Sequence, residues 1–140
     1  MPMVCPDGVL MIAFIVATLI LVSTIPPQPP PPPPTETYRV TAYCSCEICC
    51  GEYAKNRPNG IVYGASGEEL KAGYSIAASH DLSFNTKVII EGHTFEVQDR
   101  LATWVTDKYG LCIDIYFTDH ERARQFGVKY LEVEVKHDND

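Results

Sequence analysis

Val97-Gln98-Asp99-Arg100 and Cys112-Ile113-Asp114-Ile115-Tyr116 are the two most informative segments of this chain. Each is a short apolar segment of the kind that forms a strand, and each carries one carboxylate. A carboxylate between two isoleucines, such as Asp114, is costly to desolvate unless it is paired, hydrogen-bonded or used in chemistry. Two such carboxylates close together are the minimum needed to cleave a glycosidic bond. Asp99 and Asp114 are therefore the first candidate site residues.

Further short strands are expected on both sides of these stretches. Alternating apolar and polar residues, rich in β-branched and aromatic side chains, are typical of strands. Gly92 is expected to form the tight turn of a hairpin. Many short strands with a single helix favour a mainly β fold, a compact β-barrel rather than a sandwich of long strands. The expected strands span residues 37–43, 74–78, 86–90, 93–98, 111–117 and 130–135.

One short helix is expected near the end of the chain. Thr118 and Glu121 have the spacing of a capping box, in which the two side chains satisfy the first free backbone amides of a helix. Gly127 follows at the position where a glycine commonly ends a helix. The predicted helix spans residues 119–126, whereas residues 44–60 and 103–110 are predicted to be loops.

The N-terminal part of the chain predicts a membrane anchor. A tail of residues 1–8 is followed by residues 9–25, which read VLMIAFIVATLILVSTI. As a helix this run is roughly 25 Å long at about 1.5 Å per residue, slightly shorter than a hydrocarbon core of about 30 Å. The run is either an uncleaved anchor or a secretion signal. No Lys or Arg precedes Arg39, and the missing basic start favours the anchor.

The segment after the apolar run predicts a stalk. Residues 26–34 contain eight prolines in nine residues, a composition that adopts polyproline II at about 3.1 Å per residue. A linker over residues 26–36 would hold a domain of residues 37–136 away from the membrane, although a docking site for a proline-binding module is an alternative. We expect this domain to be extracytoplasmic, in the periplasm or at the cell surface, or secreted if the helix is cleaved.

The charge balance excludes one class of partner. The chain has 11 Lys and Arg against 18 Asp and Glu, for a net charge of −7. Nucleic-acid binding requires a basic face, so no nucleic-acid partner is expected.

The cysteines allow two interpretations. In an extracytoplasmic domain disulfides are expected, and because five of the six cysteines lie in this domain, one of them would be free or paired between chains. Zinc is the competing interpretation because Cys46 and Cys49 have CxxC spacing. The clustered thiols lack a second ligand pair in the sequence, so we expect disulfides and neither a metal nor another cofactor. His93 is interpreted as a turn residue and His120 as a helix N-terminal residue. The disulfide candidates are Cys44, Cys46, Cys49, Cys50 and Cys112.

The order of several motifs resembles a known family. VTAYCSCEICCG is followed by GASG, IAASHDLSFNTKVII, VQDR and IDIYFTDHERARQFG. This order resembles the three-aspartate (3D) domain, a six-stranded double-psi β-barrel of cell-wall-cleaving proteins. The family is related to membrane-bound lytic transglycosylases of the MltA type and to RlpA-like proteins.

The resemblance implies a reaction on peptidoglycan glycan strands. Such barrels cut the β-1,4 bond between N-acetylmuramic acid and N-acetylglucosamine without water and leave a 1,6-anhydro sugar. Asp114 matches the family's catalytic aspartate, which protonates the leaving oxygen and then takes the proton of the sugar's 6-hydroxyl. A group with both duties needs a raised pKa. Asp99 matches the second aspartate and is expected to raise the pKa of Asp114 or to hold the sugar.

The sequence also departs from the family pattern. The position of the first aspartate falls on Ser79, which leaves Asp81 and His80 as candidate catalytic residues. Arg100 replaces the usual continuation after the second aspartate and is expected to pair with Asp99 or to face solvent. In the enlarged loop that follows, Trp104 and Tyr109 are candidates for stacking on a sugar, with plain packing as the alternative. A non-catalytic glycan-binding barrel and a structural module of the same fold remain alternatives to the enzyme.

Overall fold

The computed structural model describes residues 26–55 and 57–136. The chain divides into two compact units, Met1–Pro31 and Pro32–Asp140. The predicted tail at 1–8 and apolar helix at 9–25 lie outside the described residues. In the described part of the chain, no helix has both the length and the apolar character needed to cross a bilayer. Residues 26–34 are exposed and form no regular secondary structure.

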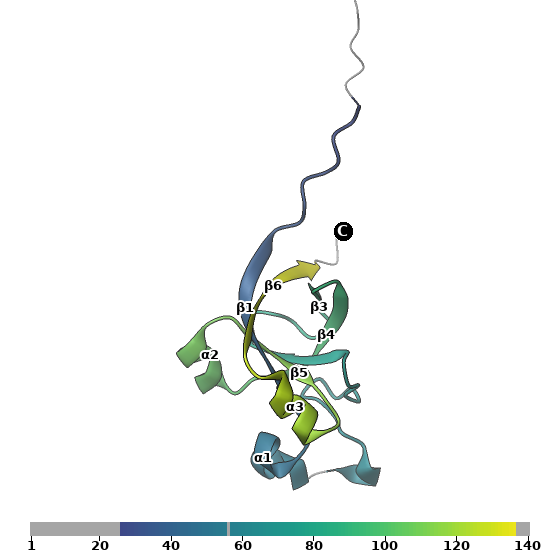
Figure 1. Cartoon of the computed structure of the whole chain (residues 1–140). Helices are drawn as coiled ribbons and strands as arrows, with labels where there is room; N and C mark the ends of the chain where they lie inside the picture. The colour runs from purple at the N-terminus through teal and green to yellow at the C-terminus, as the bar shows by residue number, and fades with distance from the viewer. Residues whose placement is uncertain (1–25, 56, 137–140) are drawn as a thin grey trace, which may run out of the picture. The chain divides into compact units, whose positions relative to one another are not determined.

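The second unit is a six-stranded closed β-barrel, which confirms the predicted mainly β class (Figure 1). Around the barrel the strands follow the order β1-β5-β2-β4-β3-β6. Two pairs of neighbours, β1 with β5 and β2 with β4, run parallel, and the other pairs are antiparallel. The strands are β1 (Thr35–Tyr43), β2 (Ser75–Ala78), β3 (Lys87–Ile90), β4 (His93–Arg100), β5 (Cys112–Tyr116) and β6 (Lys129–Lys136).

Alternation along the strands fills the barrel interior with apolar side chains. In β5, for example, Ile113 and Ile115 belong to the central core, so Asp114 between them lies on the outer face. The buried core residues are Tyr38, Val40, Ile76, Ala78, Leu82, Val88, Ile90, Phe95, Val97, Ile113, Ile115 and Val133.

The predicted hairpin around Gly92 is confirmed. Ile90 pairs with His93, so β3 and β4 are joined by the two residues Glu91 and Gly92. Both have positive φ, 49° and 79°. Two consecutive positive φ angles match the twist of antiparallel strands in a two-residue turn, and Gly92 adopts one of them without a steric penalty.

The predicted helix is confirmed as α3 (His120–Phe126), but its cap is one residue later than expected. Asp119, rather than Thr118, is the N-cap, and its side chain accepts a hydrogen bond from the Arg122 amide. Gly127 follows the helix with φ 70°, as predicted. Aspartate is at least as good an N-cap as threonine, which explains the shift.

The expectation of a single helix is wrong. The predicted loops contain α1 (Glu47–Cys50), two 3₁₀ turns (Gly51–Lys55 and Pro58–Gly60) and α2 (Thr103–Tyr109). Helix α2 was not predicted because Ala102 at its N-cap makes no side-chain hydrogen bond and its residues have poor helix propensity. Val105 of α2 packs on an outer cluster of Ala77, Leu101 and Cys112, so tertiary packing stabilises the helix.

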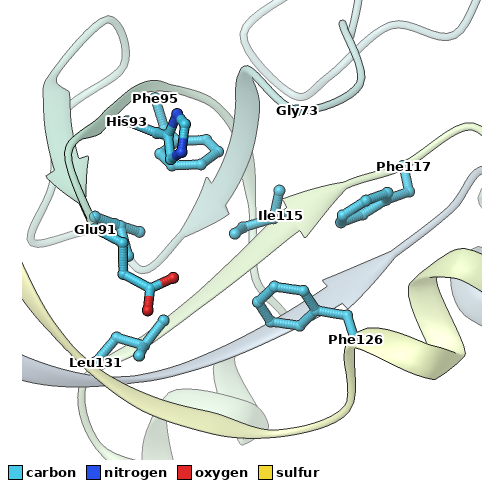
Figure 2. A pocket seen from close by; sticks show the side chains of 9 residues that line it. Gly73, Glu91, His93, Phe95, Ile115, Phe117, Phe126 and Leu131 are labelled. Atoms are coloured by element: carbon cyan, nitrogen blue, oxygen red, sulfur yellow. The ribbon is translucent and has the colours of Figure 1, made fainter.

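A small apolar hollow lies beside the β3–β4 turn (Figure 2). Its volume is about 170 Å³. Phe117 and Phe126 line it with their ring centroids 6.0 Å apart. His93, predicted to be a turn residue, also lines this hollow at the start of β4.

Candidate functional site

A bulge in β4 brings the two predicted aspartates to one face of the sheet. The register between β2 and β4 shifts, so that Ile76 pairs with Val97 but Ala77 pairs with Asp99. Ala77 also pairs with Asp114 on its other side. Paired residues share a face, and a bulge re-aims the side chain that follows it. Asp99 and Asp114 therefore lie on the outer face, separated by one strand.

Asp114 is a partly buried carboxylate with a raised pKa. Burial raises the pKa most, while the hydroxyl of Thr41, which donates a hydrogen bond to Asp114 Oδ1, and the charge of Arg39 lower it. The negative charge of Asp99 raises the pKa of Asp114 further. The effect of burial on the pKa of Asp114 thus outweighs the two contacts that favour its carboxylate form, and a raised pKa is the direction that a general acid requires.

Both carboxylate oxygens of Asp99 accept hydrogen bonds. The Tyr43 hydroxyl donates to Oδ2 over 2.7 Å, and the amides of Ala65 and Arg100 donate to Oδ1 over 3.0 and 2.9 Å. Burial and the neighbouring Asp99 raise the pKa of Tyr43, so its hydroxyl stays protonated and able to donate this hydrogen bond. Asp99 therefore joins β1, β4 and the GASG loop at residues 64–67.

The GASG loop lies directly on the bulge of β4. The Ser66 amide donates to Gln98 O over 3.1 Å. A Cβ added at Gly64 would lie 2.2 Å from the same carbonyl oxygen, closer than any real contact allows. Gly64 is therefore required for the close approach of two backbones that delivers the Ala65 amide to Asp99.

Arg100 has neither of the two positions predicted for it. Its side chain does not pair with Asp99 and does not extend into solvent. The guanidinium donates to the carbonyl oxygens of Ser79 and Leu82 over 3.0 and 2.7 Å and stacks on Phe84 at 3.9 Å from the ring centroid. A planar guanidinium suits these two carbonyl oxygens and one aromatic ring, and through them Arg100 holds the turn after β2.

His80 and Asp81 lie in that turn and line a hollow of about 270 Å³. Both side chains are exposed, and Ser79 donates a hydrogen bond to Asp81. Thr103, Thr106 and Asp107 line the opposite side from α2. The hollow is at the end of β2, the strand that carries Ala77, but neither it nor the apolar hollow is lined by Asp99 or Asp114.

The two predicted stacking residues are on α2. Trp104 is 61% exposed and Tyr109 is 41% exposed. Tyr109 already stacks on the Arg39 guanidinium, which lies 4.3 Å from the ring centroid. Trp104 is therefore the freer of the two aromatic surfaces for contact with a ligand.

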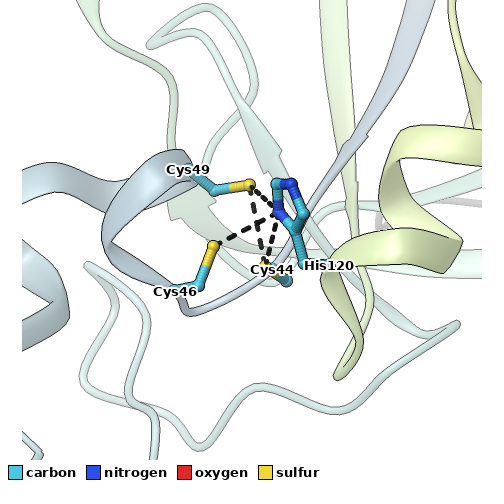
Figure 3. A group of neighbouring side chains, drawn as sticks. All are labelled: Cys44, Cys46, Cys49 and His120. Atoms are coloured by element: carbon cyan, nitrogen blue, oxygen red, sulfur yellow. Dashed lines mark hydrogen bonds between the residues drawn. The ribbon is translucent and has the colours of Figure 1, made fainter.

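A third group of side chains comes together where β1 leads into α1 and where α3 begins (Figure 3). Ligand atoms of Cys44, Cys46, Cys49 and His120 all lie within 4.8 Å of one another. Cys44 Sγ and Cys49 Sγ are 3.6 Å apart, much longer than a disulfide bond of about 2.05 Å. The prediction that these cysteines form disulfides is not borne out among the described residues, where all five candidates, Cys44, Cys46, Cys49, Cys50 and Cys112, are free thiols.

The sequence analysis missed this group because its fourth member is distant in sequence. His120 was interpreted only as a helix N-terminal residue, and it is one, but its ring also faces three cysteines more than 70 positions earlier. A third cysteine two residues before a CxxC pair, followed by a histidine elsewhere, was the available signal. Cys50 and Cys112 are outside the group.

The sequence matches no model of a known protein family and no curated protein.

Proposed function

We propose that this chain is a lytic transglycosylase-like enzyme of the 3D double-psi barrel type, which cleaves peptidoglycan glycan strands. The proposed substrate bond is the β-1,4 linkage between N-acetylmuramic acid and N-acetylglucosamine. The two parallel strand pairs of a closed six-stranded barrel are compatible with this fold type. The apolar run at 9–25 would anchor the protein in the membrane and leave the barrel outside the cytoplasm.

The observation that supports the proposal most is the position of both aspartates opposite Ala77. Asp114, whose pKa burial raises, begins the reaction protonated and donates its proton to the glycosidic oxygen as the bond to the leaving sugar breaks. Its carboxylate then accepts the proton of the sugar's 6-hydroxyl while that oxygen attacks the anomeric carbon. The net reaction uses no water and returns Asp114 to its protonated state.

The other candidate residues have supporting roles in this proposal. Asp99 remains in its hydrogen bonds and acts through its negative charge, which favours the protonated form of Asp114. The hollow beside His80 and Asp81 receives part of the glycan strand. Trp104 provides an exposed ring for stacking against a sugar face.

Product analysis tests the proposal. The purified full chain is incubated with cell-wall sacculi, and the soluble products are identified by mass spectrometry. We expect 1,6-anhydro-muropeptides from the wild type, none from Asp114→Asn, and an unchanged yield from Glu132→Gln, which alters an exposed carboxylate on β6 outside both hollows. Hydrated reducing ends in place of anhydro ends would contradict the transglycosylase mechanism.

A non-catalytic glycan-binding barrel is the second candidate function. The observation in its favour is that neither of the two hollows is lined by Asp99 or Asp114. Such a barrel would sediment with sacculi, release no product, and bind equally well with Asp114→Asn. The same incubation distinguishes the two functions.

A further inference from the structure

Four of the six distances between the ligand atoms of Cys44, Cys46, Cys49 and His120 match the edges of a metal-binding tetrahedron, and all six are within 4.8 Å. Zinc–sulfur bonds of about 2.3 Å and zinc–nitrogen bonds of about 2.0–2.1 Å give a tetrahedron with S···S edges near 3.8 Å and S···N edges near 3.5 Å. The distance from Cys44 Sγ to Cys49 Sγ is 3.6 Å. The distances from His120 Nδ1 to the sulfurs of Cys44, Cys46 and Cys49 are 3.6, 3.3 and 3.5 Å.

Hydrogen bonding does not explain this convergence. Three sulfur atoms approach the same nitrogen, His120 Nδ1. A ring nitrogen offers either one proton or one lone pair in the ring plane, so it can make one good hydrogen bond and not three. A cation at the centre of the four atoms would satisfy all of them together.

We propose that Cys44, Cys46, Cys49 and His120 form a structural zinc site. Three soft thiolates and one imidazole are a donor set typical of structural zinc, whereas magnesium and calcium prefer oxygen ligands. Four protein ligands fill a tetrahedral site, so no position is left for a substrate or a reactive water. The site is therefore independent of the aspartate pair and of the proposed glycan cleavage.

The local backbone positions each of the four ligands. Cys44 is buried at the end of β1, and Cys46 is the N-cap of α1, where its carbonyl accepts the amides of Cys49 and Cys50 over 3.2 and 2.9 Å. This turn places Cys46 and Cys49 on one side of α1, as a CxxC pair requires (Figure 3).

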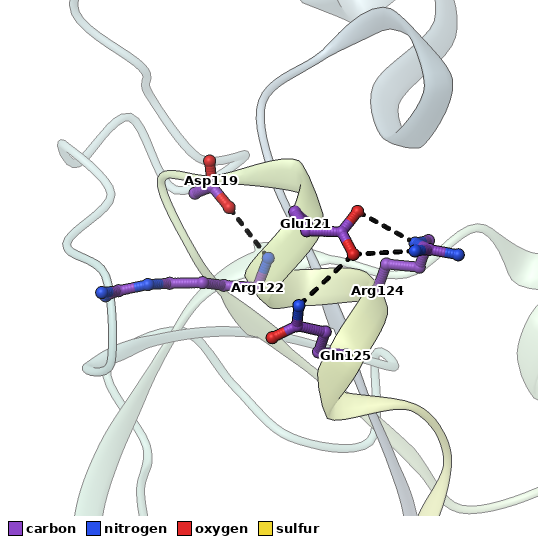
Figure 4. A network of polar contacts seen from close by, with 5 residues as sticks. All are labelled: Asp119, Glu121, Arg122, Arg124 and Gln125. Carbon is purple, nitrogen blue, oxygen red and sulfur yellow. Dashed lines mark hydrogen bonds and ion pairs between the residues drawn. The ribbon is translucent and has the colours of Figure 1, made fainter.

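The fourth ligand is positioned by the start of α3 (Figure 4). Asp119 accepts the Arg122 amide over 2.9 Å and so fixes the first turn, in which His120 is the first helical residue. Glu121 adds an ion pair with Arg124 at 2.7 Å. The helix therefore begins at a defined residue, His120, and the imidazole ring of His120 points toward the three sulfurs.

Metal binding would connect two distant parts of the chain. The three cysteines and His120 are separated by 71 to 76 positions. Zinc with three thiolates and a neutral imidazole carries a net charge of −1, and the three thiol protons go to solvent. Arg57 provides a positive charge nearby, since its guanidinium donates to Ser45 O over 3.1 Å.

Zinc titration of the reduced, metal-free full chain tests the proposal. We expect one equivalent of Zn²⁺ to bind with an apparent dissociation constant in the nanomolar range or below. Co²⁺ used as a probe should show the strong visible absorption of tetrahedral thiolate coordination. Bound Zn²⁺ should protect Cys44, Cys46 and Cys49 from alkylation, measured by peptide mass spectrometry, but leave Cys50 reactive.

Two neighbouring variants provide the matched comparison. Cys49→Ser removes an exposed ligand and should weaken zinc binding by more than about 100-fold, because residues that merely orient ligands already contribute about 10–100-fold. Cys50→Ser changes the adjacent thiol, which donates to Cys44 O instead, and should bind zinc as the wild type does. His120→Asn is the second ligand variant if Cys49→Ser does not fold.

Three results would overturn the zinc site. The first is a wild-type chain that binds less than half an equivalent of zinc. The second is equal weakening of zinc binding by Cys49→Ser and Cys50→Ser. The third is a disulfide between Cys44 and Cys49 in protein purified without reductant that persists when zinc is supplied. Each is read from the wild type or from the paired variants, independently of any glycan cleavage.

Discussion

The aspartate face (Asp99 and Asp114) and the Cys/His cluster (Cys44, Cys46, Cys49 and His120) each bring together polar side chains from separate segments. They differ in the partners that their polar atoms contact. Both oxygens of Asp99, and Oδ1 of Asp114, accept hydrogen bonds from protein groups. The cluster consists of four ligand atoms whose nearest polar neighbours are mainly one another. The hydrogen bonds of these carboxylates come from protein groups, whereas four converging soft donors are a set that one bound cation would satisfy.

This difference matters for whether the cysteines indicate an oxidising compartment. Clustered thiols in a small domain suggest disulfides and an oxidising compartment. If the same thiols bind zinc, they are kept as thiolates and no longer indicate any compartment. The proposed extracytoplasmic location then depends on the apolar run at 9–25 and on the proposed substrate.

The largest predicted effect is the stabilisation of the folded chain by zinc, and its absence would remove the difference between the cluster and the two aspartates. Zinc at about 1,000 times its dissociation constant should stabilise the folded chain by about 4 kcal/mol, since it binds only the assembled ligands. For a domain of this size the melting temperature should rise by at least about 10 °C. Thermal unfolding with and without zinc measures this, and Cys49→Ser should show almost no rise. An equal rise in that variant would place the stabilising zinc elsewhere.

Asp114→Asn provides a further control for this experiment. Its substitution lies on the outer sheet face, outside the cluster of Cys44, Cys46, Cys49 and His120. The zinc-dependent rise in its melting temperature should therefore equal that of the wild type. A smaller rise would show that the two regions are coupled.

The barrel could be predicted from sequence because its signal is local. Alternation in β1, β5 and β6, together with Gly92 at a two-residue turn, is visible within a few residues. Helix α2 could not be predicted, because the packing of Val105 on residues distant in sequence stabilises it. The position of Asp99 likewise depends on a bulge that no local pattern reveals.

The second prediction concerns the loop that supports Asp99. Gly64→Ala should destabilise the fold by about 2–3 kcal/mol, because the new Cβ meets Gln98 O at 2.2 Å and must push two backbones apart. Chemical denaturation measures the loss. The displaced loop should also lose the Ala65 hydrogen bond to Asp99 and reduce glycan cleavage, while zinc binding is unchanged.

Gly67→Ala is the control for this prediction. Gly67 has φ 86° but no atom within 4 Å of an added Cβ, so alanine there suffers backbone strain of about 1–2 kcal/mol without a clash. The two variants together separate strain from close approach. If Gly67→Ala costs as much as Gly64→Ala, the contact with β4 is not what fixes the loop.

The candidate site residues also differ in whether nearby or distant parts of the sequence reveal their roles. The sequence identified Asp114 because its two isoleucine neighbours are adjacent to it. His120 was recognised as a helix residue from its neighbours, but its role as a ligand depends on Cys44 at the end of a strand 76 positions earlier. Ligand sets completed by a single distant residue need the tertiary structure, since nothing near His120 in the sequence points to the cysteines.

The smallest predicted effect concerns pH and has an unusual sign. Burial raises the pKa of Asp114 above its ordinary value of 3.8, so the folded chain holds this proton more tightly than the unfolded chain. The contribution of this tightly held proton to the free energy of unfolding is fully present below about pH 3.8. It is lost as pH rises through the raised pKa of Asp114 in the folded state. Asp114→Asn carries no such charge. The free energy of unfolding of this variant, relative to the wild type, should therefore increase from acidic to neutral pH.

Denaturant unfolding between about pH 3.5 and 7.5 measures this trend, with Asp107→Asn as the exposed control. At neutral pH Asp114→Asn should be at least as stable as the wild type and yet inactive on sacculi, as expected where a site retains a costly group for chemistry. The opposite trend would be a decrease in the variant's free energy of unfolding, relative to the wild type, as pH rises. It would mean that Thr41 and Arg39 stabilise the carboxylate form of Asp114 more than burial destabilises it. Asp114 would then be an ordinary structural acid, and the aspartate face would have no group prepared to donate a proton.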